Sequence, residues 1–309
     1  MRERHFLSLG PSGFHRIAYT DWGDPAHPHA VVCVHGLARN SRDFDFLATG
    51  LESVCRVVCM DVVGRGDSDW LENKSDYTFS TYQSDAAAML ARITAPAAGT
   101  WLDALRGRAA NGGQPRLDWV GTSMGGLIGM LLAAKPGSPI RRLVLNDVGP
   151  FIPWSALFRM KGYVGRGRRF VSMEEVESYL REVCASFGPL SDEQWRHLAL
   201  HGSSPADDGG FALRYDPGLG RGLHGHIDPE FPIGPDILRG IDLWSVWNKV
   251  ECPVLVLRGA ESEVLLPSTV EEMRRRKPDL DVVEFPGVGH APALMSAGQI
   301  GVVKEFLLR

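Results

Sequence analysis

Residues 117–134 constrain the fold of this chain more than any other stretch. A mostly apolar segment at 117–120 leads into Gly121-Thr122-Ser123-Met124-Gly125, and a run of small and apolar residues follows. This order predicts a strand, a sharp turn and a helix, which is the context that a G-x-S-x-G nucleophile elbow requires. In such a turn the serine takes a strained conformation, and glycines flank it because a Cβ would collide with neighbouring backbone.

The alternative is a glycine-rich turn that happens to carry a surface serine. The chain contains 35 glycines, so the five-residue pattern alone would be weak evidence. The strand before it and the helix after it favour Ser123 as a nucleophile, because the first helical turn directs its free N–H groups toward the serine oxygen.

The rest of the chain alternates between buried strands and helices. Continuous apolar runs at 30–34, 56–60, 142–146, 253–258 and 280–285 are typical of strands buried on both faces. Helical spacing of apolar residues separates them, for example at 80–93 and 297–308. The pattern predicts an α/β fold with a doubly wound, mostly parallel sheet and helices on both faces.

The pattern changes after Pro150. Residues 151–242 contain helix signals but no buried strand, and strand patterns return near residue 253. We interpret 151–242 as a helical cap inserted into a core formed by 1–150 and 243–309. The segment 94–116, with apolar residues around Trp101, predicts a further short helix and a loop, to which we assign no function.

Charge and cysteine content limit the partners and the compartment. The net charge of −4 gives no electrostatic reason for binding nucleic acid. The first residues lack the apolar core of a signal peptide, and no apolar run is long enough to span a bilayer. Five cysteines, an odd number without C-x-x-C pairs, favour reduced thiols. A cytoplasmic protein is therefore expected.

Four motifs together resemble the α/β-hydrolase fold superfamily, in the order in which that family carries them. They are His35-Gly36-Leu37, the segment 61–68 (D-V-V-G-R-G-D-S), the Ser123 elbow and Gly289-His290. The resemblance implies an eight-stranded, mostly parallel sheet with an inserted cap. It also implies an oxyanion hole formed by the backbone N–H groups of Leu37 and Met124. His35 itself is interpreted as a structural residue of its loop.

The resemblance makes His290 the catalytic base, because it follows the last predicted strand in a glycine-rich loop. The acid has two candidates. Ser262 stands where most relatives carry the carboxylate, and a minority of the family places the acid after an earlier strand, here at Asp147. Glu263 lies one residue after the usual position, and Ser262 could then connect it to His290. We favour Asp147, whose role would be to accept the Nδ1–H and fix the imidazole tautomer.

A serine nucleophile limits the types of reaction that this chain is expected to catalyse. Haloalkane dehalogenases and epoxide hydrolases need a carboxylate nucleophile, so Ser123 favours attack on a carbonyl. We expect a serine esterase that hydrolyses small carboxylic esters through an acyl-enzyme. Alternatives are a C–C bond hydrolase, a cofactor-free haloperoxidase-like enzyme or a non-catalytic binding protein. No cofactor or metal ion is expected, and a homodimer is left open.

Two expectations concern residues around the site. Arg65, in the segment 61–68, is expected to be solvated. The aromatic residues of the cap region are expected either to line an apolar acyl pocket or to pack in the core: Trp154, Phe158, Tyr163, Trp244 and Trp247.

Overall fold

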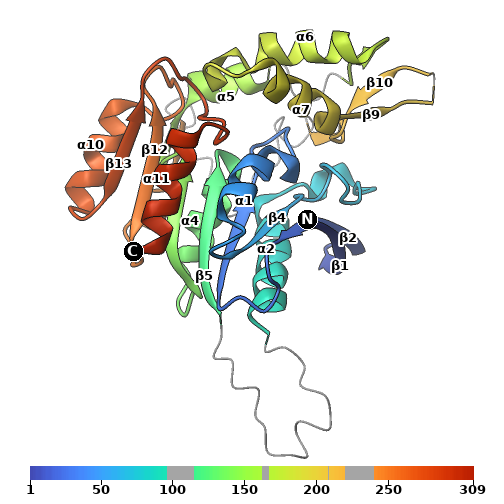
Figure 1. Cartoon of the computed structure of the whole chain (residues 1–309). Coiled ribbons are helices and arrows are strands. Elements are labelled where there is room, and N and C mark those ends of the chain that lie inside the picture. Colours follow the sequence, from blue (N-terminus) through green and yellow to red (C-terminus); the bar gives the residue numbers. More distant parts are fainter. Residues whose placement is uncertain (96–114, 162–166, 208, 220–239) are drawn as a thin grey trace, which may run out of the picture.

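The computed structural model describes residues 1–95, 115–161, 167–207, 209–219 and 240–309. Its centre is an eight-stranded sheet with the order β1-β2-β4-β3-β5-β6-β12-β13 (Figure 1). The strands are β1 (Arg2–Gly10), β2 (Gly13–Trp22), β3 (His29–Val34), β4 (Arg56–Met60), β5 (Arg116–Thr122), β6 (Ile140–Asn146), β12 (Val254–Gly259) and β13 (Asp281–Phe285).

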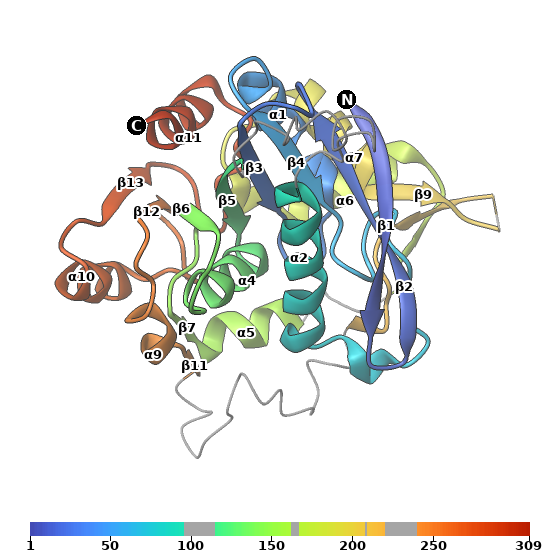
Figure 2. The ribbon, with the colours of Figure 1, turned by 90° about the horizontal axis from the view of Figure 1, so that it is seen from below.

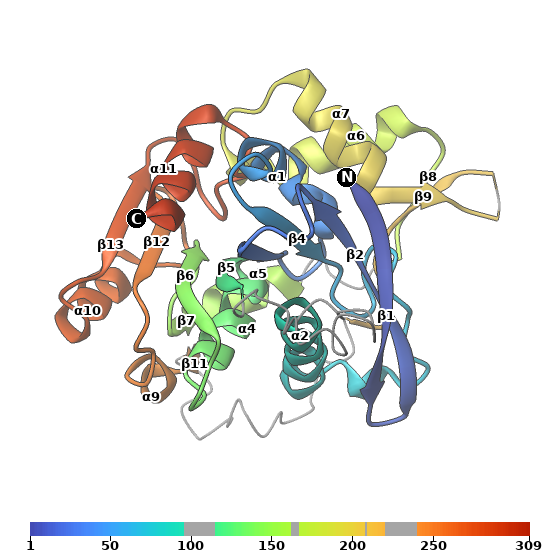
Figure 3. The same ribbon diagram turned by 60° about the horizontal axis from the view of Figure 1, so that its bottom comes forward.

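The direction of the strands agrees with the sequence pattern. β1 and β2 form an antiparallel hairpin that joins β4, and every pairing from β4 to β13 is parallel. Figure 3 shows this hairpin at one edge of the sheet and β13 at the other. The predicted eight-stranded, mostly parallel α/β sheet is therefore confirmed.

Helices cover both faces of the sheet, as Figure 2 shows. Helices α1 and α11 pack on one face, and α2, α4, α9 and α10 pack on the other. The helices are α1 (Asp45–Leu51), α2 (Phe79–Thr94), α4 (Met124–Ala133), α5 (Trp154–Lys161), α6 (Met173–Val183), α7 (Asp192–Gly202), α9 (Trp244–Trp247), α10 (Pro267–Arg276) and α11 (Ala297–Leu308).

Strand β5 and helix α4 form the centre of the core. Trp119 of β5 is fully buried, and its indole N–H donates to the Gly125 carbonyl oxygen at 3.0 Å. A buried aromatic ring with a satisfied N–H contributes both packing and a fixed geometry. This contact holds the first turn of α4 against β5, and so fixes the turn between them.

The region 151–242 adds helices and short strands at one end of the sheet. Helices α6 and α7 lie above the sheet in Figure 1 and pack against each other around Leu180 and Leu198. The minor strands are β7 (Phe151–Pro153), β8 (Arg169–Phe170), β9 (Ser203–Pro205), β10 (Phe211–Leu213) and β11 (Gly240–Asp242), and the 3-10 helices of the chain are η1 (Ser41–Phe44), η2 (Lys74–Asp76) and η3 (Ala185–Phe187).

The two cap helices α6 and α7 begin in different ways. Ser191 and Gln194 form a reciprocal capping box at the start of α7. At α6, Ser172 accepts from the Glu175 N–H, but the Glu175 carboxylate accepts from the N–H of Val171. The predicted helix around Trp101, within 94–116, lies outside the described residues. Among the helices described, none combines the length and apolar character needed to cross a membrane.

Candidate active site

Ser123 occupies a strained turn between β5 and α4. Its φ is 51° and its ψ is −115°, in a region that residues with a Cβ rarely adopt. A Cβ on Gly121 would lie 2.3 Å from the Gly125 carbonyl oxygen, and one on Gly125 would lie 2.0 Å from that of Val34. Both glycines are therefore required for the close approach of backbone that produces the elbow.

His290 connects Ser123 with Asp147. Its Nε2 lies 2.9 Å from Ser123 Oγ, and its Nδ1 lies 2.7 Å from Asp147 Oδ2. The tautomer with a proton on Nδ1 satisfies both contacts, because that N–H donates to the carboxylate and leaves Nε2 to accept from the serine hydroxyl. The arrangement can accept a proton from Ser123 and return it to another oxygen.

Asp147 is held by several donors in addition to His290. The residue follows β6 and is fully buried, with a φ of 54°. Its Oδ1 accepts the Gly259 N–H at 2.9 Å, and its Oδ2 accepts the Ser262 hydroxyl at 2.5 Å. A buried carboxylate needs such partners. These two hydrogen bonds fix the orientation of the carboxylate and of the oxygen that faces His290.

Glu263 lies apart from this line of residues. Its side chain is 66% exposed and pairs with Arg159 of α5. The hydroxyl of Ser262 donates to Asp147 and accepts from the N–H groups of Val264 and Leu265. Ser262 therefore does not bridge His290 and Glu263.

The N–H groups of Leu37 and Met124 are candidates for an oxyanion hole. Leu37 follows β3 in the wall of the cavity, and Met124 is the first residue of α4. Within the described part of the chain, neither N–H donates to a carbonyl oxygen. Free N–H groups at a helix N-terminus and in an adjacent loop are suited to stabilise negative charge.

His35 is a structural residue of the loop that carries Leu37. It is buried, its Nδ1–H donates to the Gly36 carbonyl at 2.7 Å, and its Nε2 accepts the Val62 N–H at 3.0 Å. Burial lowers the pKa of His35 to about 4. The imidazole is therefore neutral at pH 7 and links two loops at the edge of the sheet.

The prediction that Arg65 is solvated is wrong. Its side chain is fully buried, and it donates to the carbonyl oxygens of Leu37 at 2.9 Å and Val63 at 2.7 Å. Its Nη2 also lies 3.6 Å from Met124 Sδ. Arg65 thus contacts both residues of the candidate oxyanion hole. The glycines on both sides of Arg65 have positive φ and mark a tight turn, and the guanidinium lies over the rings of Tyr77 and Tyr82.

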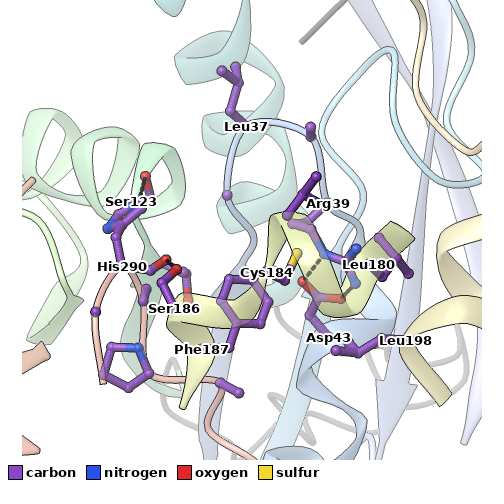
Figure 4. Close-up of a pocket in the computed structure, with 18 of the residues that line it drawn as sticks. Leu37, Arg39, Asp43, Ser123, Leu180, Cys184, Ser186, Phe187, Leu198 and His290 are labelled. Carbon is purple, nitrogen blue, oxygen red and sulfur yellow. Dashed lines mark hydrogen bonds and ion pairs between the residues drawn. The ribbon is translucent and has the colours of Figure 1, made fainter. Parts of the chain in front are cut away.

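A cavity of about 360 Å³ opens beside Ser123 and His290. Figure 4 shows these two residues on one side of the cavity and the Arg39–Asp43 pair on the other. The wall is mostly apolar, and the region 151–242 contributes part of it through these residues: Ala156, Tyr179, Leu180, Val183, Cys184, Phe187, Leu198 and Leu213.

The aromatic residues expected to line an acyl pocket lie elsewhere. Trp247 packs in the core, while Trp154 and Phe158 are exposed. Trp244 packs against the core and under the guanidinium of Arg276. Tyr163 lies outside the described residues. The aromatic rings that do face the cavity are those of Phe44, Tyr179, Phe187 and Tyr215.

Ser186 of η3 contacts the loop that carries His290. Its hydroxyl donates to the His290 carbonyl oxygen at 2.5 Å, and its own carbonyl accepts the Gly289 N–H at 2.7 Å. These two hydrogen bonds attach the region 151–242 directly to the histidine loop. Sequence reasoning missed this residue, because an isolated serine between two helices carries no distinctive pattern.

One group of side chains away from Ser123 could hold a metal ion. Donor atoms of Asp45, His197 and His201 lie within 4.8 Å of one another. The i,i+4 spacing of the two histidines on α7 is typical of metal ligands, and the sequence analysis overlooked it. In this structure Arg42 already pairs with Asp45 at 2.6 Å.

Known proteins with similar sequences identify the family of this chain. The sequence model of the alpha/beta hydrolase family matches residues 31–300. The chain is 42% identical to the 3-hydroxybutyrate-oligomer hydrolase of Cupriavidus necator over 305 residues, which is 96% of this chain and 94% of that protein.

Solved structures are similar over almost the full length. A structure from Rickettsia typhi matches with a TM-score of 0.85 and 28% identity, and covers 100% of this chain and 99% of that one. An alpha/beta hydrolase from Novosphingobium aromaticivorans matches with a TM-score of 0.78 and 32% identity, covering 99% and 98%. The chain therefore belongs to the alpha/beta hydrolase family.

Proposed function

We propose that this protein is a serine esterase that hydrolyses short oligoesters of 3-hydroxybutyrate. The observation that carries the proposal is the continuous line of hydrogen bonds from Ser123 through His290 to Asp147 beside a cavity. The substrate class is supported by the 42% identity to a 3-hydroxybutyrate-oligomer hydrolase, whose name implies cleavage of ester bonds between hydroxy acids.

In the first half-reaction Ser123 is acylated. His290 Nε2 takes the proton of the Ser123 hydroxyl while Oγ attacks the ester carbonyl carbon. The N–H groups of Leu37 and Met124 stabilise the negative charge that develops on the carbonyl oxygen. His290 then gives the proton to the departing alkoxide, the carbon–oxygen bond breaks, and the acyl group stays on Ser123.

In the second half-reaction water replaces the leaving alcohol. His290 removes a proton from the water, whose oxygen attacks the acyl carbonyl carbon. The bond between that carbon and Ser123 Oγ then breaks, His290 returns the proton to Oγ, and the hydroxy acid leaves. Asp147 keeps its charge throughout, because its role is to hold the Nδ1–H tautomer and stabilise the imidazolium. The buried hydrogen bonds from Gly259 and Ser262 support that role, since they fix the carboxylate.

The same proposal makes 151–242 a cap that controls access to Ser123, and 1–150 with 243–309 the catalytic core. Support comes from the pairing of β7 with β11, which puts the start and the end of the segment side by side. Further support is that α6 and α7 contribute residues to the cavity wall, among them Tyr179, Leu180 and Leu198. A cytoplasmic location belongs to the proposal as well, supported by five free thiols.

Hydrolysis of the linear 3-hydroxybutyrate dimer and trimer tests the function. The wild-type protein should release the monomer, and Ser123→Ala should reduce kcat by about 10⁴ or more. A fluorophosphonate should label the wild-type protein on Ser123 and leave Ser123→Ala unlabelled. Near-normal turnover of the dimer by Ser123→Ala would contradict the proposal.

A further inference from the structure

The wall of the cavity contains a partly buried ion pair across from Ser123. The Arg39 guanidinium donates to both oxygens of Asp43, from Nε at 2.8 Å and from Nη2 at 2.6 Å. The two side chains are only 13% and 19% exposed. Both residues line the cavity. Arg39 lies two residues after Leu37, and its N–H donates to the Gly36 carbonyl oxygen at 3.2 Å, so the pair and the candidate oxyanion hole share one loop.

The neighbours of this pair in the cavity wall are mostly apolar. Leu180, Cys184 and Leu198 lie around it in Figure 4. Burial alone would lower the pKa of Arg39, but the charge and hydrogen bonds of Asp43 raise it instead. The guanidinium of Arg39 therefore keeps its charge. A plain alkyl chain that filled this part of the cavity would remove water from the two charges without replacing its hydrogen bonds.

The pair has hydrogen-bonding capacity left. Among the described residues, Arg39 Nη1 has no acceptor, and the carboxylate oxygens of Asp43 can each accept more than one bond. The pair carries no net charge, so a second carboxylate would gain little at Arg39 and would be repelled by Asp43. A hydroxyl group fits better, because it can accept from Arg39 and donate to Asp43.

The direction of the bound ester follows from the position of His290. The leaving oxygen has to lie next to Nε2 to receive its proton, so the acyl chain extends to the opposite side of Ser123. In Figure 4 the Arg39–Asp43 pair lies across the cavity from His290. Arg39 also belongs to the loop of Leu37, whose N–H would hold the carbonyl oxygen of the acyl group, and its own N–H donates to the Gly36 carbonyl oxygen at 3.2 Å. In a linear oligoester of hydroxy acids, the acyl side ends in a free hydroxyl and the alcohol side ends in a free carboxylate.

We propose that Arg39 and Asp43 form a subsite for the terminal hydroxyl of a hydroxyacyl chain. This inference rests on the proposed function and adds the orientation of the substrate. The hydroxyl end lies inside, and the carboxylate end leaves past His290. The subsite distinguishes hydroxyacyl esters from alkanoyl esters of the same length.

Two substrates that differ in one hydroxyl test the subsite. They are the 3-hydroxybutyrate dimer and its analogue in which a butyryl group replaces the terminal 3-hydroxybutyryl group. One missing hydrogen-bond partner at a buried polar site corresponds to about 1–3 kcal/mol. The wild-type kcat/KM should therefore favour the dimer by about 5- to 150-fold. Methylation of the dimer's carboxylate should change kcat/KM by less than about threefold, because that end faces outward.

Paired substitutions test the residues. Arg39→Met combined with Asp43→Leu removes both charges, so that neither is left buried alone, and should lower the preference for the hydroxyl to less than about threefold. Arg42→Met with Asp45→Leu is the matched control, because this ion pair lies in the same segment and outside the cavity wall. The control should keep the wild-type preference. If the double variant does not fold, Arg39→Lys retains the charge without the planar fork and should lower the preference at least threefold.

The outcomes separate this inference from the proposed function. Equal hydrolysis of the two substrates by the wild-type protein would overturn the subsite and leave the esterase proposal intact. The subsite would also be overturned by a preference that survives substitution of Arg39 and Asp43, or by a strong requirement for the free carboxylate. If the folded wild-type protein hydrolyses neither the dimer nor p-nitrophenyl butyrate, the proposed function itself has failed.

Discussion

Replacement of Arg65 by methionine should lower kcat far more than it changes KM. The guanidinium donates to the carbonyl oxygens of Leu37 and Val63 and contacts Met124. Removal of these bonds frees the loop that presents the Leu37 N–H. Loss of a complete oxyanion donor reduces kcat by about 10²–10³. Since Arg65 acts through the donors and is not itself one of them, we expect a smaller loss, of about 10- to 100-fold.

The same substitution should also lower stability. A hydrogen bond to a charged group contributes about 1.5–3 kcal/mol, and two carbonyl groups would lose such a bond. The removal of a buried charge offsets part of this loss, because within the described residues no carboxylate pairs with Arg65. The net decrease in the free energy of unfolding should be about 2–4 kcal/mol. Urea denaturation at pH 7 measures it.

Arg56→Met provides a control for the stability effect. Arg56 is partly buried and pairs with the fully buried Asp21 at 2.9 Å, remote from Ser123. Its replacement should destabilise the protein and leave kcat on p-nitrophenyl butyrate unchanged. Arg65→Lys should lie between wild type and Arg65→Met, because a lysine cannot reach both carbonyls with one planar group. If Arg65→Met loses stability like Arg56→Met but keeps kcat within twofold, the positioning role is refuted.

Three further predictions concern the histidine loop, the acid and the pH dependence of folding. Asp147→Asn should reduce kcat by about 10⁴, because the amide would hold His290 in the wrong imidazole tautomer. Glu263→Gln should keep kcat within about twofold of the wild-type value. A large loss of kcat in Glu263→Gln, measured in steady-state assays, would reverse the assignment of the acid. Ser186→Ala should lower kcat about three- to tenfold at unchanged KM, because it removes the hydrogen bond to the carbonyl of His290; an unchanged kcat in the same assays would exclude that coupling. Burial lowers the pKa of His35 from 6.5 to about 4 in the folded protein. As the pH falls, His35 therefore binds a proton in the unfolded chain before it does so in the folded protein. The free energy of unfolding should decrease by about 3 kcal/mol between pH 6.5 and pH 4. The stability difference between wild type and His35→Gln, measured in urea, should therefore shrink over that pH range, and a constant difference would contradict the buried neutral imidazole.

The fold was predictable because its signals are local. Continuous apolar runs mark strands buried on both faces, and the glycines at 121 and 125 mark the turn where backbone approaches backbone. The structure adds the order of the strands, which brings β3, β5, β6 and β12 together. The loops after their carboxyl ends therefore meet at one edge of the sheet.

The sequence favoured Asp147 over Glu263 as the candidate acid, but it left Glu263 open because the choice depends on distances between loops. Asp147 and Glu263 both follow strands of the sheet, and the adjacency of β6 and β12 brings Asp147 next to Ser262, while His290 reaches Asp147 from the loop after β13. Arg65 was misplaced for a different reason. Charged residues are rarely buried unless paired, and here backbone carbonyls take the place of a carboxylate.

Capture of the acyl-enzyme is a direct test of Ser123 as the nucleophile. The protein is mixed with the 3-hydroxybutyrate dimer, quenched with acid during the first turnover and digested for mass spectrometry. We expect one 3-hydroxybutyryl group on the peptide that contains Ser123, attached to the serine oxygen, and none on Ser123→Ala. An acyl group on a different residue, or unimpaired turnover by Ser123→Ala, would contradict that role.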